Sequence, residues 1–361
     1  MNATLRQQLE DKNKKLTDMV IERAKRDFPE DIALIGLSGS FRTGDFHAKS
    51  DLDLIIVNNT DRGWEISACF IFDDVGYDIY CTTWDSLERK ANLATEDPGV
   101  SVLTDMQILY CAKPEYLERF QSLKQNAVDI MFTPIGKDCL DRAEKHINLA
   151  KQDYADMMLS NNIGAIRYAS ASLLYHLVNS IVNLNNTCIQ RGVKRYFEEL
   201  SAYQHLPENF EYLYMSVVEA KTAEQMKTAS HAFLSGVIKL HDEMYQEYVE
   251  QPAPTYENLD GTYEEAWCNL RNKVLASVAA KDKSYALIVA ESAQNYFDEM
   301  TADRGTKKFD LMQHFDPDNL ETFQTAFLQV MDEYLQEYHK VGRSVERYET
   351  FEALYAAYMK Q

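Results

Sequence analysis

Strand-forming runs are confined to the first third of this chain. Short apolar, β-branched or aromatic runs that suit strands occur at Ile32–Leu37, Leu52–Val57, Ile66–Phe72 and Tyr77–Thr82. After Pro134 such runs fade, and apolar residues recur at the three- and four-residue intervals of amphipathic helices. The pattern therefore predicts an α+β fold, in which a small mixed sheet flanked by helices is followed by an all-helical C-terminal region.

The same helical period predicts where the helices lie. Apolar positions with charges between them indicate a helix over Leu5–Phe28, which Pro29 ends. Residues 84–127 are also mostly helical in pattern. The helices expected beyond the sheet are Cys139–Leu159, Ile163–Arg191, Lys194–Tyr203 and Phe210–Val249, with a helical pattern again from Tyr263 to the end.

The length of the chain and one proline pair predict its division into domains. At 361 residues the chain exceeds the usual size of a single domain. The stretch Gln251–Tyr256 holds two prolines, which stop helices and favour an extended linker. We therefore expect a catalytic domain at residues 1–130, a helical substrate-side domain at 131–250, and a second helical bundle or extension at 251–361.

The composition indicates the cellular compartment of the protein and the chemical class of its partners. The formal net charge is −20. Proteins that bind nucleic-acid phosphates carry a basic face, so this charge disfavours a long nucleic-acid partner and favours a cationic partner. No apolar run suits a secretory leader or a membrane span. The six cysteines form no C-x-x-C pair, which favours reduced thiols. A cytoplasmic protein is expected, and a homodimer is compatible with the sequence.

Two closely spaced carboxylates mark the second predicted strand. Asp51 and Asp53 are two residues apart, so on a strand their side chains point to the same face while Leu52 turns to the other. Like charges this close need a compensating cation, and hard carboxylate oxygens suit Mg²⁺. The spacing therefore predicts a magnesium site at this strand.

A glycine–serine turn lies between the first two predicted strands. Gly39 and Ser40 follow one strand and precede a short helical stretch, so their backbone N–H groups and the serine hydroxyl can cradle phosphates. A phosphate-binding turn together with metal-binding carboxylates is the minimum equipment for nucleotidyl transfer.

The full segment resembles a known signature. Gly39-Ser40, a spacer that contains Gly44, and then Ser50-Asp-Leu-Asp-Leu54 are similar to the motif of the DNA polymerase beta-like nucleotidyltransferase superfamily. The short motif and the helical second half most resemble the small-molecule branch, with kanamycin nucleotidyltransferase and the streptomycin/spectinomycin adenylyltransferases. The resemblance covers about the first 130 residues, and the helical region is similar only in kind.

The resemblance implies roles for individual residues. Gly39 and Ser40 would hold the β- and γ-phosphates, and Asp51 and Asp53 would bind two Mg²⁺ ions together with the substrate ATP. Asp78, in Gly-Tyr-Asp-Ile-Tyr, matches the third carboxylate of the family, as a metal ligand or as the base for the acceptor hydroxyl. Both roles remain open for Asp78.

Several cations are candidate contacts of the nucleotide. Arg42 and Lys49 lie in the loop beside the phosphate turn, where they would neutralise the triphosphate or simply face solvent. Lys194 and Arg195 could reach the nucleotide from the helical region, or could instead be cations that favour a helix C-terminus.

These observations predict a Mg²⁺-dependent transfer of a nucleoside monophosphate, AMP from ATP, to a hydroxyl of a small acceptor, with release of pyrophosphate. A cationic, aminoglycoside-like antibiotic suits the acidic chain. Three alternatives stay open: a protein-modifying adenylyltransferase, a template-independent RNA nucleotidyltransferase, which the charge disfavours, and a non-catalytic nucleotide-sensing module of the same fold.

Overall fold

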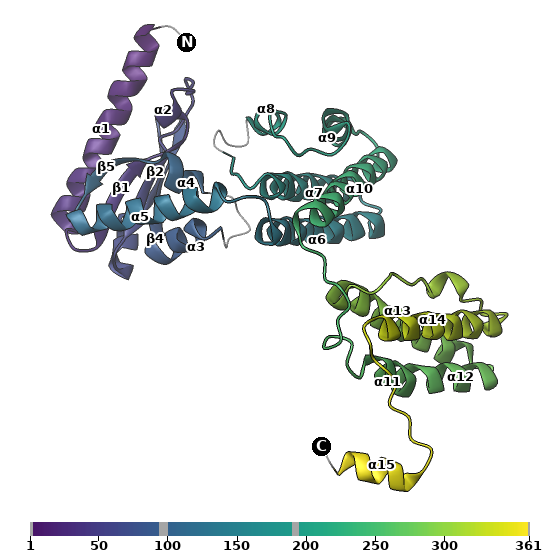
Figure 1. The fold of residues 1–361 in the computed structure, drawn as a ribbon. Coiled ribbons are helices and arrows are strands. Elements are labelled where there is room, and N and C mark those ends of the chain that lie inside the picture. Colours follow the sequence, from purple (N-terminus) through teal and green to yellow (C-terminus); the bar gives the residue numbers. More distant parts are fainter. Residues whose placement is uncertain (1–2, 94–99, 190–194, 360–361) are drawn as a thin grey trace. The chain divides into compact units, whose positions relative to one another are not determined.

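The chain forms two compact units in the computed structural model, which describes residues 3–93, 100–189 and 195–359. The first unit is Met1–Val249 and the second is Glu250–Gln361. The first contains a sheet and helices, whereas the described part of the second is built from helices (Figure 1). The α+β fold that the sequence predicts is thereby confirmed, including a helical C-terminal region.

A five-stranded mixed sheet organises the first part of the chain. Its spatial order is β3-β4-β2-β1-β5. Strand β2 pairs antiparallel with β1 and parallel with β4, while β3 and β5 pair antiparallel with β4 and β1. The strands are β1 (Ile32–Leu37), β2 (Leu54–Asn58), β3 (Ala68–Phe72), β4 (Val75–Thr83) and β5 (Gln107–Cys111).

Helix α1 (Ala3–Asp27) covers one face of this sheet. Its buried residues Leu16, Val20 and Ala24 pack with β-strand residues such as Leu54 and Ile79 in one hydrophobic cluster. The helix carries the apolar spacing that the sequence showed, so the helix expected at Leu5–Phe28 is confirmed.

The other face of the sheet is covered by α3 (Trp84–Ala91), α4 (Ser101–Asp105) and α5 (Pro114–Met131). Ile55 and Val57 of β2 belong to this second cluster. Because Leu54 and Ile56 belong to the first, β2 is buried on both faces. This central strand is therefore a rigid support for the residues that precede it.

Residues 84–127 are mostly helical, as the sequence predicts, but they also contain a strand that was not predicted. Between α4 and α5 the chain forms β5, which pairs with β1 and completes the sheet. A five-residue apolar run between two helical patterns matches either period, and only pairing with β1 decides it. The strand expected at Ile66–Phe72 begins at Ala68, because Ile66 ends a 3₁₀ turn, η1 (Asp61–Ile66).

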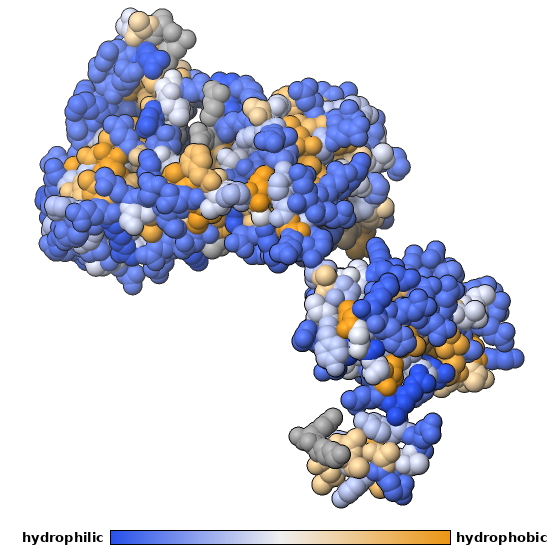
Figure 2. Space-filling view, in the orientation of Figure 1, coloured by the Kyte–Doolittle hydropathy of each residue, from blue (hydrophilic) through white to orange (hydrophobic). Residues whose placement is uncertain are grey.

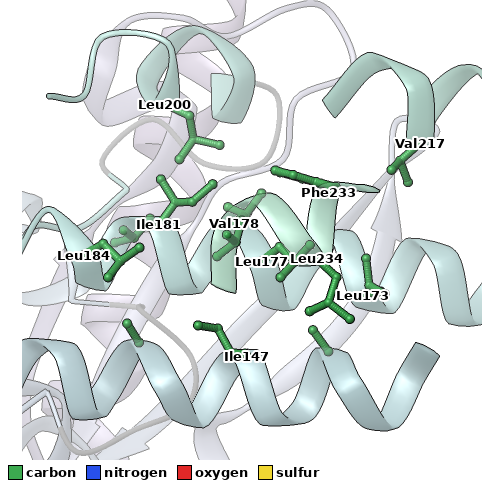
Figure 3. Packing of buried hydrophobic residues seen from close by; sticks show 14 of the residues in the cluster. Ile147, Leu173, Leu177, Val178, Ile181, Leu184, Leu200, Val217, Phe233 and Leu234 are labelled. Atoms are coloured by element: carbon green, nitrogen blue, oxygen red, sulfur yellow. The ribbon is translucent and has the colours of Figure 1, made fainter. Parts of the chain in front are cut away.

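Antiparallel helices form the rest of the first unit. Side chains of α6 (Lys137–Leu159), α7 (Ile163–Leu184) and α10 (Ala223–Tyr248) pack with those of α8 (Tyr196–Leu200) and α9 (Phe210–Glu219). Figure 3 shows Leu177 of α7 between Ile147 of α6 and Phe233 of α10, and Ile181 of α7 on the side of Leu200 of α8.

Two predicted helix bounds are corrected in this region. The single helix expected over Phe210–Val249 is two helices, because Thr222 caps α10 and forms a capping box with Gln225. Helix α7 ends at Leu184, before the expected Arg191, and its C-cap is Asn185. Helix α8 is also shorter than the stretch Lys194–Tyr203.

The second unit has a hydrophobic core of its own. Aromatic residues dominate it, including Tyr263, Phe297, Phe327 and Tyr334, all nearly inaccessible to solvent. Its elements are α11 (Thr262–Ala266), η3 (Trp267–Arg271), α12 (Asn272–Ala279), α13 (Lys283–Arg304), η4 (Met312–His314), α14 (Leu320–Lys340) and α15 (Phe351–Tyr358). Two of these elements, η4 and α15, bury none of their residues.

The surface agrees with the charged composition. On the face drawn in Figure 2, hydrophilic residues cover most of both units and hydrophobic residues appear in small separate patches. Among the described residues, no helix combines the length and the apolar character that crossing a membrane requires.

Candidate active site

Gly39 lies where β1 ends and the short helix α2 (Gly39–Thr43) begins. Its φ of 65° is in the left-handed region, which favours glycine. A Cβ at this position would overlap the carboxylate of Asp53. The backbone N–H of Ser38 also donates to the carbonyl of Asp53 at 3.0 Å. The glycine turn and the aspartate are thus in direct contact, and the turn requires glycine.

Asp51 and Asp53 precede β2 rather than lie within it. Leu52 between them is 3% exposed, whereas Asp51 is exposed and Asp53 is half-buried. Leu52 and Leu54 are buried as the sequence predicted, but the backbone N–H of Leu54 donates to the carbonyl of Leu52 at 2.9 Å, so the chain makes a tight turn at Asp53 instead of continuing as a strand. A shared face for the two carboxylates stays a prediction. Because β2 is buried on both faces, these two residues are presented at the end of a fixed strand.

Asp78 lies on β4, the parallel neighbour of β2. Leu54 pairs with Ile79 at the start of this ladder, so Asp53 and Asp78 each lie one residue before the first paired residue of their segments. Asp78 is exposed, while Tyr77 and Ile79 on either side of it are buried. The structure therefore places the third predicted carboxylate on the strand that neighbours β2.

Cys69 is a neighbour of Asp78 that the sequence did not single out. It faces Asp78 across the β3–β4 pair, and its thiol donates to Asp78 Oδ1 at 3.3 Å. This hydrogen bond raises the pKa of the Cys69 thiol, since losing the proton would leave two negative groups in contact. The pairing could have been found only from the hairpin register.

The donor set fits magnesium that is completed by a substrate. Among the residues that the structure describes, no three His, Cys, Asp or Glu side chains gather as a metal site by themselves. Magnesium keeps several waters and takes one or two carboxylates together with substrate phosphates. Asp53 supplies a hard oxygen of this kind beside the glycine turn, and Asp51 along the chain and Asp78 on β4 are further carboxylates of the same kind.

Two of the predicted cations, Arg42 and Lys49, have partners of their own in the structure. Arg42 is on α2 and has an ion pair with Asp105 at 3.5 Å. Lys49 Nζ lies 3.5 Å from the carbonyl of Asp74, at the β3–β4 turn. Lys194 falls outside the described residues.

Arg195, from the helical part of the first unit, reaches the loop that follows α2. Its guanidinium binds the carboxylate of Asp45, with the closest nitrogen–oxygen distance 3.1 Å. Asp45 was not singled out from the sequence, because nothing in a linear pattern relates it to a residue 150 positions away.

One region of the chain is similar to a known protein family. Residues 18–129 match the family model of the nucleotidyltransferase domain. The resemblance seen in the sequence is therefore confirmed at the level of that domain. No curated protein sequence matches the chain. A crystal structure of a nucleotidyltransferase-like protein from Exiguobacterium sibiricum 255-15 aligns over 74% of this chain and 91% of its own, with 14% identity and a TM-score of 0.37.

Proposed function

We propose that the nucleotidyltransferase domain at residues 18–129 moves AMP from ATP to a hydroxyl group of a small molecule and releases pyrophosphate. The contact between Gly39 and the Asp53 carboxylate carries this proposal. It joins a turn suited to phosphates and a carboxylate suited to magnesium at one point, as nucleotidyl transfer needs.

The turn would hold the β- and γ-phosphates of ATP. Gly39 has no side chain to keep a ligand from its backbone, and Ser40 adds a hydroxyl donor. Arg42, Lys49 and Arg195 would supply positive charge around the triphosphate, and Lys194 is proposed with them from the sequence alone.

Asp51, Asp53 and Asp78 would hold two Mg²⁺ ions together with the phosphates. Bound there, magnesium supplies charge stabilisation for the departing pyrophosphate and activates the acceptor oxygen. The role of these residues in the chain is to fix the ligand oxygens. The fully buried strand β2 follows Asp51 and Asp53, and β4, which carries Asp78, is anchored by its buried residues Tyr77 and Ile79.

The reaction forms one bond and breaks one. The acceptor oxygen attacks the α-phosphorus, the bond between that phosphorus and the bridging oxygen breaks, and pyrophosphate leaves with the electron pair. The acceptor hydroxyl loses its proton. In the alternative role of Asp78, as the base and not a metal ligand, its exposed carboxylate takes this proton and passes it to solvent. Orientation of the acceptor in line with the α-phosphate accounts for much of the rate in such reactions.

The helical part of the first unit would select the acceptor. It lies in the same compact unit as the catalytic residues and touches their loop through Arg195. The net charge of −20 supports a cationic acceptor of the aminoglycoside class, because an acidic protein attracts cations over distance.

The test is label transfer from ATP carrying ³²P at the α-phosphate, with Mg²⁺ and a panel of cationic and neutral hydroxyl compounds. We expect labelled acceptor and pyrophosphate in equal amounts. Asp53→Asn should abolish transfer while the thermal unfolding midpoint stays close to that of the wild type. Asp61→Asn, at the exposed start of η1 beyond the other end of β2, is the control that should keep activity.

Two results would contradict the proposal. One is the absence of transfer from every nucleoside triphosphate. The other is Asp53→Asn protein with wild-type turnover. Label found on protein instead of the small acceptors would indicate the protein-modifying alternative. Calorimetric titration with Mg²⁺-ATP provides a readout that does not depend on the acceptor.

A further inference from the structure

Asp45 and Arg195 form a contact between the phosphate turn and the helical part of the first unit. Arg195 is the N-cap of α8, and both its Nε and its Nη2 bind Asp45, at 3.3 Å and 3.1 Å from Oδ2. Its Nη1 binds Glu198, one turn along α8, at 2.7 Å. One carboxylate thus holds the guanidinium from the turn, and the other holds it from α8.

Asp45 is itself part of the turn that presents Gly39 and Ser40. Its backbone N–H donates to the carbonyl of Ser40 at 3.0 Å. The same carbonyl accepts from the backbone N–H of Gly44, which has a φ of 77°. The Asp45 side chain therefore starts from the hydrogen bonds that close the turn.

The next residue holds this segment against the protein. Phe46 is 8% exposed, and its ring stacks on that of Phe41 with the centroids 4.0 Å apart. With its backbone bonded to Ser40 on one side and Phe46 buried on the other, Asp45 has a defined place. Arg195 consequently meets an ordered partner.

The ion pair is too exposed to matter much for overall stability. The side chains of Arg195 and Asp45 are 32% and 48% exposed, and ion pairs of such exposure contribute little free energy. Arginine is nevertheless well suited to orienting work, because its planar group binds a carboxylate through two nitrogens at once. This contact therefore fixes the position of Arg195 relative to the turn.

We propose that Asp45 is a positioning residue of the nucleotide site, which acts by holding Arg195 and the start of α8 against the Gly39–Ser40 turn. This inference rests on the function proposed above. It identifies Asp45 as the residue that connects the turn to the helical part of the first unit. Without Asp45, the partner that Arg195 keeps among the described residues is Glu198 of its own helix, and the turn loses this ion pair to the start of α8. The expected consequence is weaker nucleotide binding with a smaller change in the chemical step.

The first experiment needs no nucleotide. Hydrogen exchange of the backbone amides of residues 39–46 is measured in the full-length wild type and in Arg195→Gln. We expect exchange in this turn to become roughly two- to fivefold faster, the factor that an exposed ion pair commonly contributes. Lys113→Gln, which removes an exposed ion pair to Glu30, is the matched control and should leave the turn unchanged. Unchanged exchange in Arg195→Gln overturns the proposal.

The second experiment asks whether Asp45 acts through Arg195. Apparent KM for ATP and kcat are measured for Asp45→Asn, Arg195→Gln and the double variant. We expect Asp45→Asn to raise KM about two- to fivefold, more than it lowers kcat, and to have no further effect once Arg195 is glutamine. An equal effect of Asp45→Asn in both backgrounds would show that Asp45 acts independently, against the proposal.

The two experiments distinguish failure of the proposed function from failure of the positioning role of Asp45. A wild-type protein that does not bind Mg²⁺-ATP overturns the proposed function, whatever the exchange of residues 39–46. A protein that binds and transfers AMP, but shows no coupling between Asp45 and Arg195, keeps that function and loses only this inference.

Discussion

Gly39 can be tested by the smallest change that adds a side chain. Gly39→Ala places a methyl group on the Asp53 carboxylate and requires an alanine at a φ of 65°. Strain of this kind costs about 1–3 kcal/mol, so we expect a lower free energy of unfolding and loss of nucleotide binding. Urea unfolding and calorimetric titration with Mg²⁺-ATP measure the two effects.

Gly76→Ala is the control for this change. A Cβ at Gly76 in β4 meets no atom within 4 Å, and its backbone is not left-handed. Its stability and nucleotide binding should stay near those of the wild type. Equal behaviour of the two alanine variants would show that the Gly39 contact has no importance.

Ser40→Ala removes only the hydroxyl that is proposed to meet the phosphates. A hydrogen bond to a charged group contributes about 1.5–3 kcal/mol, so we expect roughly ten- to hundredfold weaker ATP binding and a smaller change in apparent KM for the acceptor. Ser67→Ala, on the exposed residue before β3, should change neither. Unchanged ATP affinity in Ser40→Ala would exclude the hydroxyl from the site.

Residues close in sequence were predictable, and those joined by the fold were not. The spacing of Gly39, Ser40, Asp51 and Asp53 within one strand–turn–strand segment carries its chemistry in linear form. The contact of Cys69 with Asp78 depends on the hairpin register, and that of Asp45 with Arg195 on the packing of α8. No local pattern specifies either.

At the scale of elements, the α6–α7 interface contains a titratable group that should make stability depend on pH. His146 of α6 is 5% exposed, and its ring centroid lies 5.9 Å from that of His176 on α7. Burial, and to a smaller extent the charge of His176, lowers the pKa of His146 to about 4. The folded protein therefore holds this imidazole neutral.

The unfolded chain takes up the proton first, because a free histidine has a pKa near 6.5. His146 should thus contribute its full stability above about pH 6.5 and lose it as the pH falls toward 4. We expect the free energy of unfolding to drop by about 1 kcal/mol between pH 7 and 5.5 on this account. His146→Gln should flatten that slope in urea titrations, and an unchanged slope would contradict the assignment.

Elements were predictable where their periodicity is long and uninterrupted. Helices α1 and α6 have such patterns, and the structure contains both. Strand β5 escaped because five residues are too few to establish a period. The break between α9 and α10 carried a sequence signal, the capping box Thr222-Ala-Glu-Gln225, which the surrounding helical pattern obscured.

At the scale of the whole molecule, the two units have separate hydrophobic cores. The core of the second unit contains Phe297, Phe327 and Tyr334, while the described cores of the first unit are built from residues up to Val249. We therefore expect a fragment of residues 1–249 to fold, to remain soluble and to bind Mg²⁺-ATP with the affinity of the full chain. Circular dichroism melting and calorimetric titration measure both properties.

The same fragment shows what the second unit contributes. If residues 250–361 only extend the molecule, AMP transfer by 1–249 should also match that of the full chain. Transfer that is lost while ATP binding persists would assign the second unit to acceptor recognition. A fragment that aggregates or fails to melt cooperatively would contradict the independence of the two cores.

Any side chain at Gly39 would occupy the space of the Asp53 carboxylate. We therefore expect substitutions at these two positions to be correlated during evolution. A relative that keeps every acidic residue but has lost this glycine cannot present the aspartate in the same way. In an alignment of related sequences, the residue at the position of Gly39 should therefore distinguish relatives that bind nucleotides from relatives that keep only the fold.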